Sequence, residues 1–231
     1  MAGLLSLASL RGEQRSFRSD AIAEIDKLSP PLKVIGKAKI PGPCVITVNH
    51  YTRPGFQAWW LALGVSAALE VELHWIVTSA WRYADQLRSW TITPVSTWIL
   101  KRTAAVYDFT RMPPMPPRPE EAGLRAQAVL EIVRYARKAD CPVIGLAPEG
   151  GDFSSPGEVT ELPPGLGRLM LHLAGVGMAV LPVGAFEANG QFCLNFGQAY
   201  HLTPPLVTSR KARDVWARQV VRTKIQELLE K

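Results

Sequence analysis

The stretch that decides the fold reads Cys44-Val45-Ile46-Thr47-Val48-Asn49-His50, an apolar and β-branched run that ends on two polar residues. A Pro-Gly-Pro turn at positions 41–43 precedes the run, which predicts a short buried strand. Open α/β sheets bind their ligands at the carboxyl ends of the strands. His50 is therefore a candidate general base, held by the strand and still within reach of solvent.

Strands and helices are expected to alternate around this stretch, which predicts an α/β fold with a single domain. Apolar runs bounded by turn residues indicate strands at 32–39, 44–48, 73–78, 103–109, 142–147, 179–187 and 192–196. Helices are expected at 1–29, 56–69, 80–101 with a break near Pro94, 119–139, 165–175 and 209–231. Because the last two strands are spaced as a hairpin, the sheet is predicted to be mixed but mostly parallel, with helices flanking it.

We divide the chain into an amphipathic helical segment at 1–31, an α/β domain at 32–204, and a basic amphipathic helix at 205–231 that packs on the domain. The proline-rich stretch 112–119 can form neither helix nor sheet interior. It is predicted to be a stiff surface loop, and a linker between two domains is the alternative.

Two further features have both a structural and a lipid-binding interpretation. The terminal helix carries an apolar stripe with Arg218 and Arg222 beside it, so its basic face is either solvated or in contact with a membrane surface. Trp59 and Trp60 open an apolar helix after His50. They are expected in the core, with an acyl-chain tunnel or a membrane-facing wall as the alternative.

The composition is that of an ordinary globular protein, with 47% hydrophobic and 20% charged residues among 231. The three cysteines are far apart, so neither a disulfide framework nor a metal cluster is expected. Residues 1–112 carry 13 basic and 8 acidic side chains, 113–204 carry 6 and 9, and 205–231 carry 7 and 3. Two basic ends suggest an anionic partner, either a membrane surface or a phosphate-bearing substrate; no nucleic-acid partner is expected.

The apolar runs are too short or too interrupted by turn residues to span a bilayer. The amino-terminal segment lacks the positive charge that opens a signal peptide. We therefore expect a cytoplasmic protein that is peripherally associated with a membrane.

Four motifs, taken in order and spacing, resemble those of the glycerolipid acyltransferase family over roughly residues 32–200. The first runs from Val34 through the Pro-Gly-Pro turn to Asn49-His50. The others are Leu146-Ala147-Pro148-Glu149-Gly150, the glycine-led helix start Gly165-Leu166-Gly167-Arg168-Leu169-Met170, and the strand Ala179-Val180-Leu181-Pro182-Val183-Gly184. The resemblance implies an α/β domain of that family's type.

The resemblance also implies transfer of a fatty acyl group from a thioester, acyl-CoA or acyl carrier protein, to the hydroxyl of a lysophospholipid or similar amphipathic alcohol. No cofactor or metal would be bound permanently. His50 would remove the hydroxyl proton, and Glu149 would position the acceptor. The candidate substrate-binding residues are Asn49, Arg53, Gly150, Gly151 and Arg111, of which either arginine would hold a phosphate group.

Two positions depart from the family's pattern. Gly55 stands five residues after His50, where the family has an aspartate that orients the imidazole. Asp152 stands two residues after Gly150, where the family usually has an arginine. Asp152, Asp108 or a backbone carbonyl is a candidate substitute for the missing carboxylate. The alternative function is an acyltransferase-like protein that binds lipid or acyl-CoA without turning it over.

Overall fold

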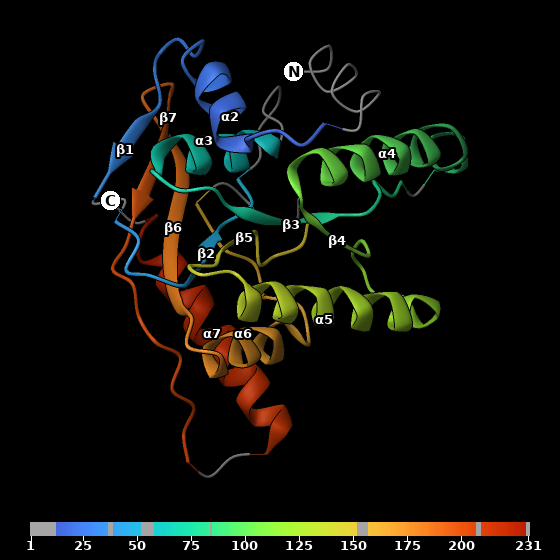
Figure 1. The fold of residues 1–231 in the computed structure, drawn as a ribbon, viewed down its shortest axis with the longest axis vertical. Helices are drawn as coiled ribbons and strands as arrows, with labels where there is room; N and C mark the ends of the chain where they lie inside the picture. Colours follow the sequence, from blue (N-terminus) through green and yellow to red (C-terminus); the bar gives the residue numbers. More distant parts are fainter. Residues whose placement is uncertain are drawn as a thin grey trace.

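A sheet of seven strands forms the centre of the molecule, and helices lie on both of its faces (Figure 1). The computed structural model describes residues 13–36, 39–51, 58–83, 85–151, 157–206 and 209–229. The strands are β1 (Lys33–Ile35), β2 (Cys44–Val48), β3 (His74–Thr78), β4 (Thr110–Met112), β5 (Val143–Leu146), β6 (Ala179–Ala188) and β7 (Gln191–Phe196). Their order across the sheet is β1-β7-β6-β2-β5-β3-β4.

Five neighbouring strands, β6, β2, β5, β3 and β4, run parallel to one another. β7 pairs antiparallel with β6, and β1 runs beside β7 in the same direction as β7. The prediction of an α/β fold with a mixed, mostly parallel sheet is therefore confirmed. Every residue of β2 is buried, as expected for a parallel strand that is covered on both faces.

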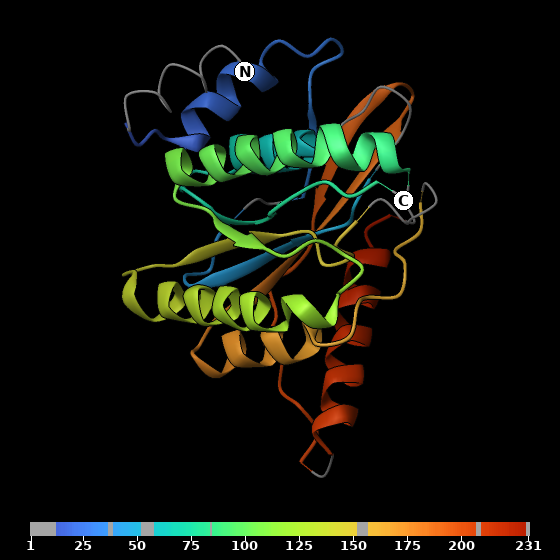
Figure 2. The same cartoon turned by 90° about the vertical axis from the view of Figure 1, so that its right-hand side faces the viewer.

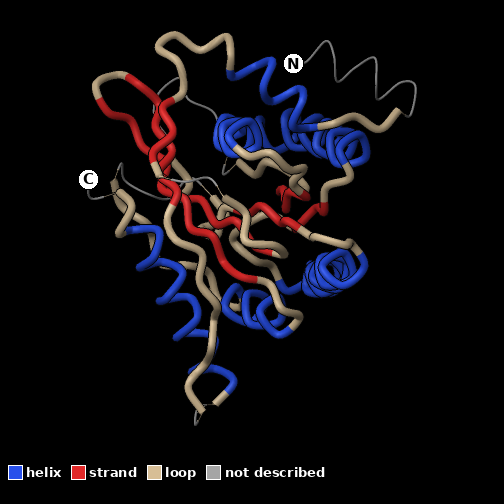
Figure 3. The backbone as a smooth tube through the Cα atoms, turned by 60° about the vertical axis from the view of Figure 1, so that its left-hand side comes forward, coloured by secondary structure: helices blue, strands red, loops and turns tan. Residues whose placement is uncertain are grey.

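Six α-helices flank the sheet within the described ranges: α2 (Phe17–Ile25), α3 (Trp59–Ala68), α4 (Gln86–Tyr107), α5 (Ala122–Lys138), α6 (Leu166–Gly175) and α7 (Arg210–Gln226). α2, α3 and α4 cover one face, and α5, α6 and α7 cover the other (Figure 2). The strands form a single layer between these two groups of helices (Figure 3). Each face has its own core, with Val48 and Leu63 in the first and Ile144 and Met170 in the second.

A large side chain and a glycine fit together where β3 meets β5. Trp75 lies opposite Gly145 in the strand register, and a Cβ added to Gly145 would come within 2.7 Å of the indole. The indole Nε1 donates to Ser66 Oγ of α3 at 3.0 Å, so the polar edge of this buried ring has a partner. Gly145 therefore allows the tryptophan to join the sheet to α3.

The sequence prediction was wrong for residues 103–109, which do not form a strand. α4 continues through Pro94 to Tyr107, and Asp108 ends it in a left-handed conformation at φ 55° with its N–H bonded to Ala104 O. Pro94 is exposed, so water can replace the helical hydrogen bond that proline removes. The strand at this place is shorter and later, at 110–112.

The proline-rich stretch is a loop within one domain, which excludes the linker alternative. Two arginines from different elements bind its backbone: Arg82 Nη1 donates to Pro116 O at 2.8 Å, and Arg125 Nη2 donates to Pro114 O at 3.2 Å. Arg82 Nη2 also pairs with the carboxylate of Glu121, in the 3-10 turn η1 (Pro119–Glu121) that leads into α5. The loop is thus fastened on both sides.

Within the described ranges, no helix has both the length and the apolar content that crossing a bilayer requires. The two tryptophans at the start of α3 have different environments. Trp60 packs against the first core, whereas Trp59 is 42% exposed.

Candidate active site

The candidate site lies where two adjacent parallel strands end. His50 follows β2 and Glu149 follows β5, and these strands are paired in register from Cys44 opposite Val143 to Thr47 opposite Leu146. Neighbouring strands are about 4.8 Å apart, so the two connecting loops leave the sheet side by side. His50 and Glu149 therefore lie at the same edge of the sheet.

Asn49 fixes the backbone just before His50. Its side-chain Nδ2 donates to Ala185 O at 2.9 Å, and its Oδ1 accepts from Ala185 N at 2.6 Å. These two bonds continue the pairing of β2 with β6 beyond Val48 opposite Val183. Asn49 is only 3% exposed, so the structure gives its amide a positioning task, whereas we expected it to contact substrate.

The carboxylate of Glu149 is buried and accepts three hydrogen bonds from the protein. His50 N donates to Oε2, while Thr160 N and Thr160 Oγ1 donate to Oε1 at 2.9 and 3.2 Å. Glu149 is 3% exposed, and a carboxylate at that depth is stable only when its oxygens have partners. We expected Glu149 to position the acceptor; the observed contacts show it holding the backbone of His50.

Tyr51 ties down the other side of His50. Its hydroxyl donates to Glu187 Oε2 at 3.2 Å, near the end of β6, and its ring stacks on Phe192 with centroids 6.4 Å apart. His50 is thus the half-buried member of a tripeptide whose two neighbours are buried. Part of His50 is therefore open to solvent while its backbone is held, although its imidazole Nδ1 is buried.

The segment at 157–162 contains Thr160, which donates to Glu149, and this segment is itself bound by side chains of α7. Val159 N donates to Gln226 Oε1 at 2.8 Å, and Arg222 Nε donates to Val159 O at 2.8 Å. Arg218 binds Leu162 O in the same way. These two arginines therefore hold a loop of the domain, which differs from the solvated or membrane-facing basic surface that we expected on this helix.

Gly150 is required by the geometry of the turn after Glu149. Its φ of +74° lies in the left-handed region, and an added Cβ would come within 2.8 Å of Met115 Cγ. Met115 belongs to the proline-rich loop, so this loop packs directly on the turn. Gly151, the next residue, is half-buried.

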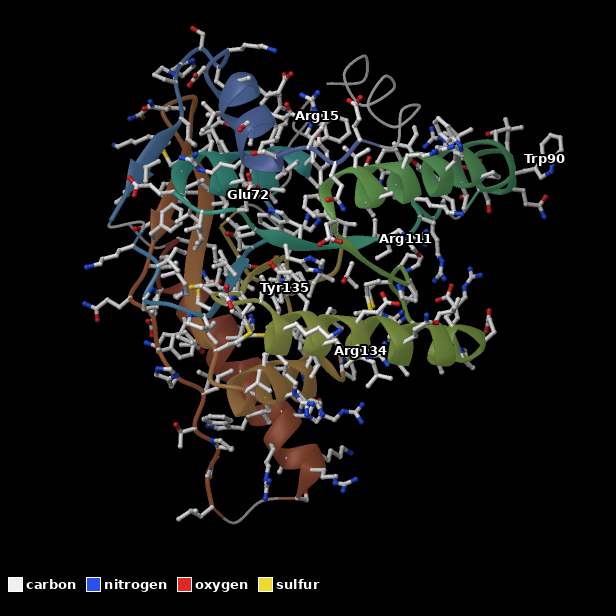
Figure 4. The ribbon with its side chains drawn as sticks, in the orientation of Figure 1. Arg15, Glu72, Trp90, Arg111, Arg134 and Tyr135 are labelled. Carbon is white, nitrogen blue, oxygen red and sulfur yellow. The ribbon has the colours of Figure 1, made fainter. Side chains whose placement is uncertain are left out.

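Arg111 and Asp108 are not brought to His50. Arg111 lies in β4 (Figure 4). This strand is three positions from β2, which is about 14 Å across the sheet. Asp108 precedes β4 and so lies at the opposite, amino edge, beside the buried His74. Asp108 therefore cannot replace the missing aspartate.

Three sequence positions of interest, Arg53, Gly55 and Asp152, lie outside the described residues. Thr160, Tyr51 and Glu187 are residues of the site that sequence reasoning missed. They had no motif or spacing to mark them, because each acts through a partner distant in the sequence, up to 136 positions away. In the described part of the chain, no group of three or more His, Cys, Asp or Glu side chains could hold a metal ion.

Fold and site together define an α/β domain with a histidine presented at the carboxyl edge of its central parallel strands, the edge at which such sheets bind ligands. No protein-family model and no curated protein matches the chain.

Proposed function

We propose that this protein is an O-acyltransferase of the glycerolipid acyltransferase type. It moves a fatty acyl group from acyl-CoA or acyl carrier protein to the hydroxyl of a lysophospholipid or similar amphipathic alcohol. The proposal rests on the position of His50 just after β2, where its backbone N–H donates to the buried carboxylate of Glu149. Such fixed placement of a half-buried imidazole is what a general base needs.

In the proposed reaction, one imidazole nitrogen of His50 takes the hydroxyl proton as the alcohol oxygen attacks the thioester carbonyl. The tetrahedral intermediate then collapses, the carbon–sulfur bond breaks, and the thiolate takes the proton from the imidazolium. The products are an ester and a free thiol, and the imidazole returns to its neutral form. Atoms and charge balance without a metal or a redox partner.

The proposed contacts to the acceptor differ for the two arginines. Arg53 is three residues from His50 in the sequence, so it is our candidate for holding a phosphate near the reacting hydroxyl. Arg111 starts about 14 Å away across the sheet and would meet only a remote part of a long acceptor. Asn49 and Glu149 contribute to the proposed reaction indirectly, by holding the backbone at His50 in place.

The test is thiol release from acyl-CoA, measured with and without a panel of lysolipids. His50→Ala should lower acceptor-dependent release at least about a hundredfold, the size of effect that general-base loss produces. The matched control is His172→Ala, which removes an exposed histidine from α6 and should leave release unchanged. Full transfer by His50→Ala would refute the mechanism.

A second candidate function is binding of lipid or acyl-CoA without turnover. Two sequence observations favour it: Gly55 stands where the family has the orienting aspartate, and Asp152 stands where it usually has arginine. This candidate predicts saturable acyl-CoA binding with no acceptor-dependent thiol release from the wild-type protein. Specific turnover that depends on His50 would eliminate it.

The acceptor of the proposed reaction is a bilayer lipid, so the proposal implies peripheral association with a membrane.

A further inference from the structure

The first half of α4 extends beyond the sheet that it covers. With 22 residues, α4 is about 33 Å long, whereas the neighbouring strands β3 and β4 have five and three residues and span about 17 and 10 Å. Three of its four buried residues, Ala104, Val106 and Tyr107, lie in the last turn. The helix begins after β3 at the carboxyl edge, and its first half projects past the strands (Figure 1).

The projecting half of α4 and the first residues after it expose large apolar side chains. Leu87, Trp90, Val95 and Trp98 are 72%, 80%, 56% and 56% exposed. Leu87 and Trp90, and likewise Val95 and Trp98, are i,i+3 neighbours, and at 3.6 residues per turn all four lie within an arc of about 140° on one side of the helix. Figure 4 shows Trp90 pointing away from the body of the molecule. We call these four residues the α4 face. Exposed apolar side chains gathered in this way mark an interaction surface.

The charged side chains of α4 itself are all positive. Residues 86–107 contain Arg88, Lys101 and Arg102 and neither aspartate nor glutamate. The Arg102 guanidinium lies over the Trp98 ring at 5.8 Å. The nearest acid in the sequence is Asp85, which caps the helix through Arg88 N and pairs with Arg88 at 3.6 Å. Lys101 therefore places a positive charge beside an apolar surface.

We propose that the α4 face docks on the surface of an anionic lipid bilayer. Tryptophan favours the bilayer interface because its ring is apolar and its N–H is polar, and lysine and arginine beside it attract anionic headgroups. The face also lies at the carboxyl edge of the sheet, the edge that carries His50. The α4 face is then the surface through which the protein contacts a membrane. This inference does not depend on whether His50 is catalytic.

The test is co-sedimentation with vesicles of phosphatidylcholine, with and without phosphatidylglycerol. Wild type should bind the anionic vesicles, and Trp90→Ala/Trp98→Ala should weaken this binding about thirtyfold, since binding scales with the apolar area inserted. The matched control is Leu124→Ala/Leu130→Ala, which removes two side chains of α5 that are 61% and 56% exposed. The control should bind within about twofold of wild type.

The charge is tested separately with Lys101→Glu. This reversal should weaken binding to phosphatidylglycerol vesicles about tenfold and leave binding to neutral vesicles unchanged. Equal binding by wild type and the tryptophan variant, or no binding of wild type to anionic vesicles, would overturn the proposal. So would a wild-type dimer that Trp90→Ala/Trp98→Ala converts to a monomer, because a second copy would then occupy the face.

Failure of docking can be told apart from failure of the proposed acyl transfer. His50→Ala should bind vesicles as wild type does, because it leaves α4 intact. Thiol release should be measured in detergent micelles, where docking is not needed, and there the tryptophan variant should equal wild type. Circular dichroism and thermal melting of each variant verify that it is folded.

Discussion

The carboxylate of Glu149 is expected to stabilise the fold, because it is buried and accepts three hydrogen bonds. Glu149→Gln keeps the shape but replaces one acceptor oxygen with an NH₂ group. If the remaining oxygen stays on the two Thr160 donors, the NH₂ group faces the N–H of His50, and two donors oppose each other. Loss of one charge-assisted hydrogen bond in a buried site costs about 2 kcal/mol, and weakening of the other two adds about 1 kcal/mol.

The comparison variant is Thr160→Val, which removes only the Oγ1 bond and keeps the bond from Thr160 N. It should cost about 1 kcal/mol. Urea titrations give both values: the midpoint should fall for each variant while the slope stays constant. If Glu149→Gln costs no more than Thr160→Val, the buried carboxylate does not hold His50 as we describe.

The same pair of residues tests whether Glu149 acts through His50. If it does, Glu149→Gln should lower the proposed transfer activity in the wild-type background and have no further effect on His50→Ala. A full additional loss in the double variant would instead indicate direct contact between Glu149 and substrate.

Three other predictions concern fixed points of the fold. Gly145→Ala should cost about 1–3 kcal/mol in urea unfolding, because its Cβ would lie 2.7 Å from Trp75, and the tryptophan emission should shift. Gly150→Ala should cost about 1–2 kcal/mol, and adding Met115→Ala should recover only the contact part of that cost, because the φ of +74° remains unfavourable. Burial lowers the pKa of His74 from 6.5, against a smaller opposing effect of Asp108, so protonation favours the unfolded chain. Its neutral form supports stability above pH 6.5, and stability is lost as the pH falls below that value; thermal melts should show a steeper loss for wild type than for His74→Gln.

The sequence was most informative where one physical pattern operates locally. The β-branched run of β2 and the apolar run of β5 gave their bounds to within a residue or two, since a parallel strand buried on both faces is apolar throughout. The stretch 103–109 failed because Ala104-Ala105-Val106-Tyr107 is apolar enough for a strand, while its first residues continue a helix. A short apolar run cannot by itself distinguish these two cases.

The candidate site was predictable only in part, because several of its contacts join loops that are distant in the sequence. His50 and Glu149 each follow a strand that was predicted from the alternation of strands and helices. The contacts of Glu149 with Thr160 and of Tyr51 with Glu187 depend on loops that meet in three dimensions. Asn49 illustrates the limit: the family resemblance implied a substrate contact, but its amide is bonded to the backbone of β6.

The support of Glu149 by α7 has a consequence for how the protein is made. Gln226 and Arg222 hold the segment that carries Thr160, yet they follow every strand in the sequence. During synthesis from the amino end, the sheet can form before these residues leave the ribosome. We therefore expect the polar anchor behind His50 to be completed only after every strand of the sheet has been synthesised, so a nascent chain can hold a formed sheet with an unfinished site.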